Sequence, residues 1–326
     1  MSRSRPLPVP VLRRVVHGAT RAPSVHNTQP WRWRATGGCL ELHLDPARRL
    51  LATDPDGRSA TISCGAALHH AQVVAGALGW SSTVVRHPEG PAASLLARIQ
   101  HEPAAPPHDA AALLEAVEVR FTDRRRFTSW PIPQDRLAHL VDVARAWGAE
   151  ATVVTDARDR LRAERLVLQA GALQARSRRT AEERDAWVDR RTPDGIPAAV
   201  LTRSGVRADA HPHRYESVPD TDLERQDLRD ADSLMVLHAE NDDPPSWLRA
   251  GEGLSALWLT ATTLGLSVVP LSQATEVDEV REALRHQVLG GAGHALLLAR
   301  IGWQEIGRSE QPRTPRRPVD EVLDLA

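Results

Sequence analysis

The chain has 326 residues, of which 41% are hydrophobic and 25% charged, and its formal net charge is -1 at pH 7. This composition is typical of a soluble globular protein of one large domain or two smaller ones. A net charge near zero gives no general attraction to nucleic acid or to a membrane surface. All 41 basic residues are arginines, which excludes a Schiff-base lysine, hence ordinary PLP chemistry, and a P-loop lysine.

Cysteine content and the N-terminus indicate the compartment. Cys39 and Cys64 are the only cysteines, so the chain has neither a disulfide scaffold nor a C-x-x-C motif. Residues 1–10 are rich in arginine and proline and have no apolar core, unlike a signal peptide. Since no run of 18 apolar residues occurs either, we expect a cytoplasmic protein.

The first hundred residues alternate between helical and extended patterns. We predict helices over 9–19 and 60–80 and strands over 31–34, 40–44, 83–86 and 95–99. The second helix is apolar on nearly every side, which is typical of a buried helix. Its neighbouring His69 and His70 point about 100° apart, so we expect core or interface histidines and not a pair of metal ligands.

An Ala/Pro-rich linker at 103–108 precedes a second series of elements. We predict helices over 111–119, 134–147, 158–177, 247–264, 277–288 and 319–325, and strands over 151–155, 233–238, 268–271 and 295–301. Residues 177–219 lack clear periodicity, which favours a functional loop or lid. A disordered insertion is the alternative, although Trp187 and Tyr215 favour a lid that packs against the protein.

The two long apolar helices resemble each other. Each is alanine-rich, ends in a Leu-Gly step and precedes a β-branched strand. This similarity indicates an internal repeat of two like lobes.

The segment from Ala22 to Trp31 reads A-P-S-V-H-N-T-Q-P-W. Pro23 ends the preceding helix, and polar side chains then fill five of six positions: Ser24, His26, Asn27, Thr28 and Gln29. Many hydrogen-bonding groups with little charge suit the edge of a planar, neutral heteroaromatic ring. From residue types alone, an Asx/Ser turn between a helix and a strand is the alternative.

The order of these residues closely resembles the P-S-x-x-N-x-Q-P-W loop of the FMN-dependent nitroreductase superfamily, and His26 before Asn27 resembles its Acg-type branch. The resemblance implies an α+β, nitroreductase-like fold in which two similar lobes, 1–102 and 109–326, form a pseudo-dimer. The linker 103–108 would join them, and 177–219 would be a lid-like insertion in the second lobe. Superfamily dimers hold FMN at the subunit interface, where this loop packs on the flavin from the partner subunit. The loop residues that would bind the cofactor are therefore Pro23, Ser24, His26, Asn27 and Gln29.

Two arginine-rich segments extend the resemblance. Arg120-Phe-Thr122-Asp-Arg124 resembles the R-x-[ST]-x-[RK] motif that grips the ribityl and phosphate groups, and Arg316-Arg317 resembles the C-terminal basic pair that binds the phosphate. Several guanidiniums suit a phosphomonoester because they bind it bidentately. A solvated charged face is the alternative for each segment. Because Phe127 comes one residue later than in the superfamily pattern, the arginine of 124–126 that faces the phosphate is left open.

The segment 264–273 resembles the superfamily's G-L-x-x-x-P stretch, whose backbone amides approach flavin N5. The resemblance places Leu271, Ser272 and Gln273 near the ring, although Ser272-Gln273 replaces the acidic residue and glycine of many relatives. The first lobe has no R-x-S-x-R motif and the second has no P-S-x-x-N loop. We therefore expect one complete FMN site per chain, between the lobes.

These features predict an oxidoreductase that passes electrons from NAD(P)H through FMN to a nitroaromatic or quinone. The flavin carries the chemistry, so no side chain needs to be catalytic, and no metal is expected. The alternative is an FMN-binding or sequestering protein whose closed lid allows little or no turnover. A nucleic-acid binder is disfavoured by the balanced charge, and a metal hydrolase by the irregular surroundings of its best cluster, His211-Pro-His213. The chain is expected to be a monomeric pseudo-dimer or a homodimer.

Overall fold

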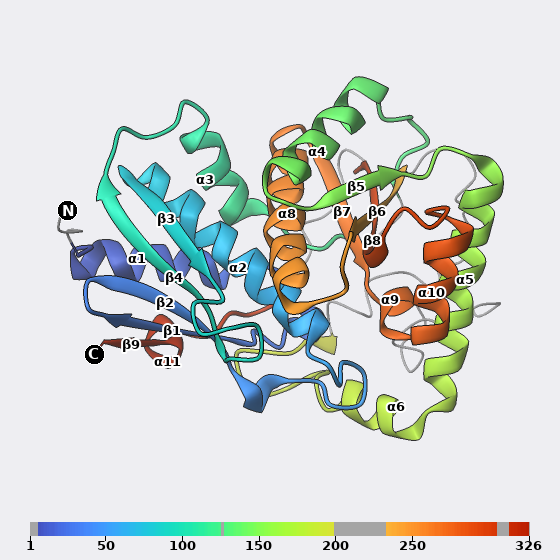
Figure 1. Ribbon diagram of the computed structural model, residues 1–326, viewed down its shortest axis with the longest axis horizontal. Helices are drawn as coiled ribbons and strands as arrows, with labels where there is room; N and C mark the ends of the chain where they lie inside the picture. The colour runs from blue at the N-terminus through green and yellow to red at the C-terminus, as the bar shows by residue number, and fades with distance from the viewer. Residues whose placement is uncertain (1–5, 125–126, 199–232, 305–312, 326) are drawn as a thin grey trace.

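The computed structural model describes residues 6–124, 127–198, 233–304 and 313–325. Two β-sheets lie on either side of a central pair of long helices, α2 (Arg58–Ala77) and α8 (Pro244–Thr263) (Figure 1). Both helices are buried along most of their length, as their apolar sequences predict. Among the described helices, none combines the length and apolarity that crossing a bilayer requires.

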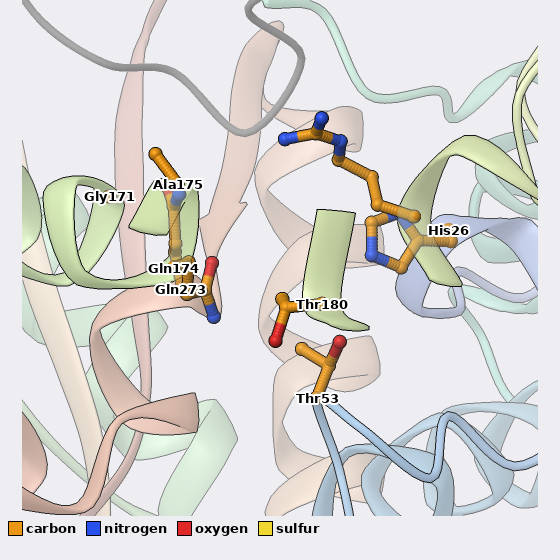
Figure 2. A pocket seen from close by; sticks show the side chains of 8 residues that line it. His26, Thr53, Gly171, Gln174, Ala175, Thr180 and Gln273 are labelled. Carbon is orange, nitrogen blue, oxygen red and sulfur yellow. The ribbon is translucent and has the colours of Figure 1, made fainter. Parts of the chain in front are cut away.

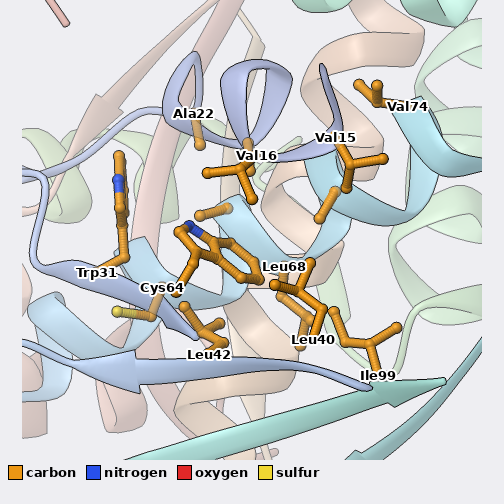
Figure 3. Close-up of a cluster of buried hydrophobic side chains, with 14 of the residues drawn as sticks. Val15, Val16, Ala22, Trp31, Leu40, Leu42, Cys64, Leu68, Val74 and Ile99 are labelled. Atoms are coloured by element: carbon orange, nitrogen blue, oxygen red, sulfur yellow. The ribbon is translucent and has the colours of Figure 1, made fainter. Parts of the chain in front are cut away.

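The first sheet has the strand order β3-β4-β2-β1-β9. Its members are β1 (Trp31–Thr36), β2 (Cys39–Leu44), β3 (Trp80–Arg86), β4 (Leu95–Pro103) and β9 (Leu323–Leu325). Trp31 and Trp33 are fully buried while Arg32 and Arg34 are exposed, because successive side chains of a strand point to opposite faces. The buried face packs against α1 (Val9–Thr20) and α2 around Val16, Leu42 and Leu68 (Figure 3).

The second sheet has the order β5-β6-β8-β7, with β5 (Glu150–Val153), β6 (Ser233–Ala239), β7 (Leu266–Leu271) and β8 (His294–Trp303). Helices cover both of its faces: α4 (Gln134–Ala146) and α8 on one, and α5 (Ala157–Arg176), α9 (Gln273–Glu276) and α10 (Asp278–Gln287) on the other. Alternate residues of β6 accordingly enter different cores, Met235 toward α8 and Leu234 toward α5. Burial on both faces explains why this strand is continuously apolar.

The two sheets share one strand order. The spatial order β3-β4-β2-β1 in the first corresponds to β7-β8-β6-β5 in the second. Along the chain, α2 connects β2 to β3, and α8 connects β6 to β7 in the same way. The helix α3 (Ala110–Val119) connects the two series and contacts both α2 and α8.

Two glycines allow α2 and α8 to touch backbone to backbone. A Cβ on Gly65 would lie 2.1 Å from the carbonyl oxygen of Leu248, and one on Gly251 would lie 2.0 Å from that of Ile62. One turn further along both helices, His69 Nδ1 lies 2.8 Å from Ser255 Oγ. Burial lowers the pKa of His69 to about 3, so this histidine is a neutral core residue.

Two sequence-based expectations about secondary structure are wrong. The helix expected over 319–325 is only one turn, α11 (Val319–Val322), after which β9 pairs in parallel with β1. Leu323 fills a position beside Trp33, and this tertiary contact outweighs the weak helical pattern of a short segment. The expected irregular stretch 177–219 begins with helix α6 (Arg178–Asp185), and its residues 199–219 lie outside the described residues. The lobe boundaries stay a prediction, although β9 belongs to the first sheet.

The glycine contact generates a stability prediction. Gly65→Ala forces backbone atoms of α2 and α8 apart, so we expect it to lower the free energy of unfolding by about 1–3 kcal/mol. Gly76→Ala in the same helix is the matched control, because its Cβ would lie 3.7 Å from Pro107 and alanine favours the helix by about 0.5–1 kcal/mol. Thermal denaturation of both variants provides the measurement. An equal Tm for Gly65→Ala and Gly76→Ala would contradict the packing.

Candidate functional site

The loop between α1 and β1 has an unusual backbone. Within the 3-10 turn η1 (Val25–Asn27) and just after it, His26, Asn27 and Gln29 have φ values of 48°, 54° and 50°. Residues other than glycine rarely adopt this left-handed backbone conformation, because it is strained and persists only where the surrounding contacts enforce it. His26, Asn27, Thr28 and Gln29 are all buried. The loop is therefore held by its contacts.

The amide side chains of Asn27 and Gln29 provide many of these contacts. Asn27 Nδ2 donates to the carbonyl oxygens of Gly195 at 2.9 Å and Pro315 at 3.0 Å, and Gly195 N donates to the carbonyl of Asn27. Gln29 Nε2 donates to Pro193 O at 3.0 Å, and its Oε1 accepts from the backbone N–H of Arg317 at 2.9 Å. The loop thus joins two segments distant in sequence, 193–195 and 315–317.

Ser24 and Pro23 serve the loop itself. Ser24 Oγ accepts a hydrogen bond from Gln29 N at 3.0 Å, and Ser24 O accepts from Asn27 N. Pro23 follows the end of α1, as its restriction of the preceding residue predicts.

Two arginines meet at the C-terminal end of α1. Arg120 is buried and Arg316 is partly buried. Arg120 Nη2 donates to Arg21 O at 2.7 Å, and Arg316 Nη2 lies 3.4 Å from both Arg21 O and Ala22 O. Backbone carbonyls at a helix C-terminus attract cations without neutralising them.

The positive charge of this pair is uncompensated. Within the described part of the chain, neither guanidinium has a carboxylate partner, and the Nε atoms of both are shielded from solvent without a hydrogen bond. Burial, together with the charge of Arg316 and other arginines, lowers the pKa of Arg120, and burial lowers that of Arg316 to about 9. A buried cation of this kind is matched to an anion with several acceptor oxygens.

The other predicted basic residues lie differently. The guanidinium of Arg317 turns toward α11, where Nη2 donates to Glu321 O at 2.9 Å and Nε lies 3.4 Å from its carboxylate. Thr122 and Arg124 are partly buried and make no hydrogen bond to another described residue. Residues 125–126 lie outside the described residues, so the choice among the arginines of 124–126 stays a prediction.

A pocket brings the loop together with the segment after β7. His26 lines it from one side and Gln273, the first residue of α9, from the other beside Gln174, with Thr53 and Thr180 between them (Figure 2). Its empty volume of about 290 Å³ includes the space that opens to solvent. Leu271 and Ser272 precede Gln273 and are partly buried. The described residues hold no group of three or more His, Cys, Asp or Glu side chains that would bind a metal ion.

Residues 177–196 contact the 48–53 loop through two carboxylates, and Thr180 and Arg184 of this segment line the pocket. Glu183 of α6 accepts hydrogen bonds from Ala52 N, Thr53 N and Thr53 Oγ1 at 2.7–2.9 Å. Asp194 accepts from both Nη atoms of Arg48 at 2.9 and 3.0 Å. Burial acts to raise the pKa of Asp194, but hydrogen bonds from Thr192 and Arg48 outweigh it and the pKa is lowered. The carboxylate therefore stays ionised against Arg48.

Sequence reasoning missed several of these residues. Arg21 adjoins the loop, and its backbone carbonyl holds both buried arginines. Its position at the end of a helix just before the P-S-V-H-N loop was an available signal. Arg48, Glu183 and Asp194 carry none, because they meet only through the tertiary fold.

Known proteins share this architecture. The model of the nitroreductase family matches residues 117–303. A Mycobacterium tuberculosis protein named "Putative NAD(P)H nitroreductase Rv3131" is 37% identical over 317 residues, which cover 96% of this chain and 91% of the relative. The same organism's "Putative NAD(P)H nitroreductase acg" is 33% identical over 324 residues, 97% and 96% of the two chains. The crystal structure titled "a putative nitroreductase from anabaena variabilis" matches at a TM-score of 0.50 and 10% identity, covering 91% of this chain and 88% of that one; it shares the fold. With a family model that covers more than half of its residues and near full-length relatives above 30% identity, the chain belongs to the nitroreductase family, and within it the chain is Acg-like.

Proposed function

We propose that the protein is an FMN-dependent oxidoreductase that passes electrons from NAD(P)H to a nitroaromatic or quinone acceptor. The observation that carries this proposal is the uncompensated charge of Arg120 and Arg316 beside the P-S-V-H-N loop. Membership of the nitroreductase family supports the class of activity. Guanidinium groups without a carboxylate partner suit the oxygens of the FMN phosphate.

The residues of the site divide the work of holding FMN. Arg120 and Arg316 would bind the phosphate, and the loop 23–29 with the segment 271–273 would border the flavin ring near the pocket of His26 and Gln273. Bound FMN supplies the hydride and electron transfer. The side chains around it orient the cofactor, and α6 with the turn at 193–195 excludes water from that side.

We further propose that each chain holds one such site, between the two lobes of a pseudo-dimer. The shared strand order of the two sheets and the reciprocal contact of Gly65 and Gly251 support this interpretation. The loop then comes from the first lobe, and Arg120 and Gln273 from the second. Whether the chain is monomeric or pairs further, and its cytoplasmic location, stay predictions.

Replacing Arg120 or Arg316 by a neutral residue tests the proposed phosphate site. A charge-assisted hydrogen bond contributes about 1.5–3 kcal/mol, so Arg120→Gln and Arg316→Gln should each weaken FMN binding roughly 10- to 100-fold. Titration of the apoprotein with FMN, followed by the quenching of flavin fluorescence, measures the change. Arg317→Gln is the matched control, because Glu321 already neutralises that guanidinium. An equal loss in all three variants, or none in the first two, would contradict the assignment.

A second candidate is an FMN-binding protein with little or no turnover. It is favoured by the contacts that Glu183 and Asp194 make with the 48–53 loop, because a closed cover would keep a nicotinamide ring from stacking on the flavin. The 177–219 segment would then be a lid.

Anaerobic reduction separates the two candidates. For a reductase, we expect the visible bands of protein-bound flavin to bleach within seconds to minutes of adding NADPH. Bands that persist in the wild type but bleach in a Glu183→Gln/Asp194→Asn double variant would favour the closed-lid candidate. A purified protein that neither contains nor takes up FMN would refute both.

A further inference from the structure

Both N–H groups of the Asn27 amide are occupied by protein atoms. Both of its N–H groups donate to backbone carbonyls, those of Gly195 and Pro315, and its Oδ1 accepts from Arg316 Nη1 at 3.1 Å. An asparagine side chain has two donors and one carbonyl acceptor. In this arrangement, no donor remains for the edge of a flavin ring, where the family resemblance places this residue.

We propose that Asn27 is a positioning residue for the phosphate end of FMN, acting through Arg316, and not a residue that recognises the flavin ring. The inference rests on the proposed function, since it concerns the same site. On this proposal, the side chain of Asn27 contacts Arg316 and not the edge of the flavin ring. Asn27 fixes the guanidinium that, together with Arg120, makes up the buried positive charge.

The partners of Arg316 explain why a neutral amide suits this position. Besides Asn27 Oδ1, three other oxygens lie within hydrogen-bond distance of its Nη1: Thr314 Oγ1 at 2.7 Å, Thr314 O at 3.1 Å and Pro315 O at 3.0 Å. Its Nη2 faces the carbonyls at the end of α1. Every one of these oxygens is uncharged, so the guanidinium is oriented and its charge remains available to an anion.

The backbone at Asn27 and the role of Gln29 support the same interpretation. Asn27 has a φ of 54°, a region that asparagine tolerates better than most residues. Gln29 Oε1 accepts from the N–H of Arg317, the residue after Arg316. The loop therefore contacts two adjacent residues near the C-terminus, Arg316 and Arg317, and these contacts hold Arg316 at the end of α1.

Asn27→Asp tests the proposal with little change in side-chain size. The new carboxylate would pair with Arg316 and cancel its charge, so we expect FMN to bind roughly 10- to 100-fold more weakly. Riboflavin has the same ring without the phosphate, and its affinity should change by no more than about twofold. Fluorescence titration of the apoprotein with both ligands measures the two constants. Asn241→Asp, at an exposed position, is the matched control for an added charge and should leave both constants unchanged.

A double-mutant cycle tests the route through Arg316. In an Arg316→Gln background, Asn27→Asp should weaken FMN binding by no more than about twofold, because the charge that it cancels is already gone. If Asn27→Asp folds poorly by its Tm, Thr314→Val removes another oxygen that holds Arg316 and should likewise weaken FMN more than riboflavin.

The outcomes separate this proposal from the proposed function. A wild-type protein that binds neither FMN nor riboflavin would overturn the proposed function itself. Binding of FMN by the wild type, with Asn27→Asp weakening FMN and riboflavin equally, would overturn only the role of Asn27 and return it to the ring. An Asn27→Asp effect that adds fully to that of Arg316→Gln would also overturn the proposal.

Discussion

The backbone contact between α2 and α8 is the constraint on which the rest of the structure depends. Gly65 and Gly251 let the two helices approach until a carbonyl of each lies where a Cβ of the other would be. Because each helix packs on its own sheet, this contact fixes the position of the first sheet relative to the second. The candidate site takes residues from both, so its geometry depends on a packing contact that contains none of its residues.

The buried arginines are the second feature that organises the molecule. Burying an ion without a counterion is costly, and the structure reduces this cost with neutral oxygens: Arg21 O for Arg120, and Asn27 Oδ1 and Thr314 Oγ1 for Arg316. The face of Trp258, 4.5 Å from the Arg120 guanidinium, adds a cation-π contact. Two other arginines of the fold are paired directly with carboxylates, Arg86 with Glu252 and Arg58 with Asp242. Arg120 and Arg316 differ from these pairs, because no carboxylate of the described residues pairs with either.

The segment from α6 to the turn at 193–195 is held in place by a different set of interactions. The helix α6 and the turn at 193–195 contact the first sheet's loops through Glu183 and Asp194, at hydrogen-bond distances of 2.7–3.0 Å. Trp187 adds cation-π contacts, with the guanidinium carbon of Arg190 4.2 Å and that of Arg48 5.9 Å from the centre of its ring. The amide of Asn27 contacts both regions, because its Nδ2 donates to Gly195 O and its Oδ1 accepts from Arg316 Nη1. The loop thus connects the turn at 193–195 to the candidate phosphate site.

The sequence by itself determined the elements and the motifs. The alternation of Trp31 to Arg34 and the apolar helices around Gly65 and Gly251 are local patterns, and their periods directly reflect which side chains a strand or a helix buries. The order of residues in the P-S-V-H-N loop also pointed to the family.

Only the tertiary structure decided which of the predicted residues meet. It separated Arg316 from Arg317, two neighbours in the chain, because one faces the end of α1 and the other Glu321. It also turned 323–325 into a strand and engaged the amides of Asn27 and Gln29 with 193–195 and 315–317. Such contacts join residues more than 160 positions apart, and no local pattern encodes them.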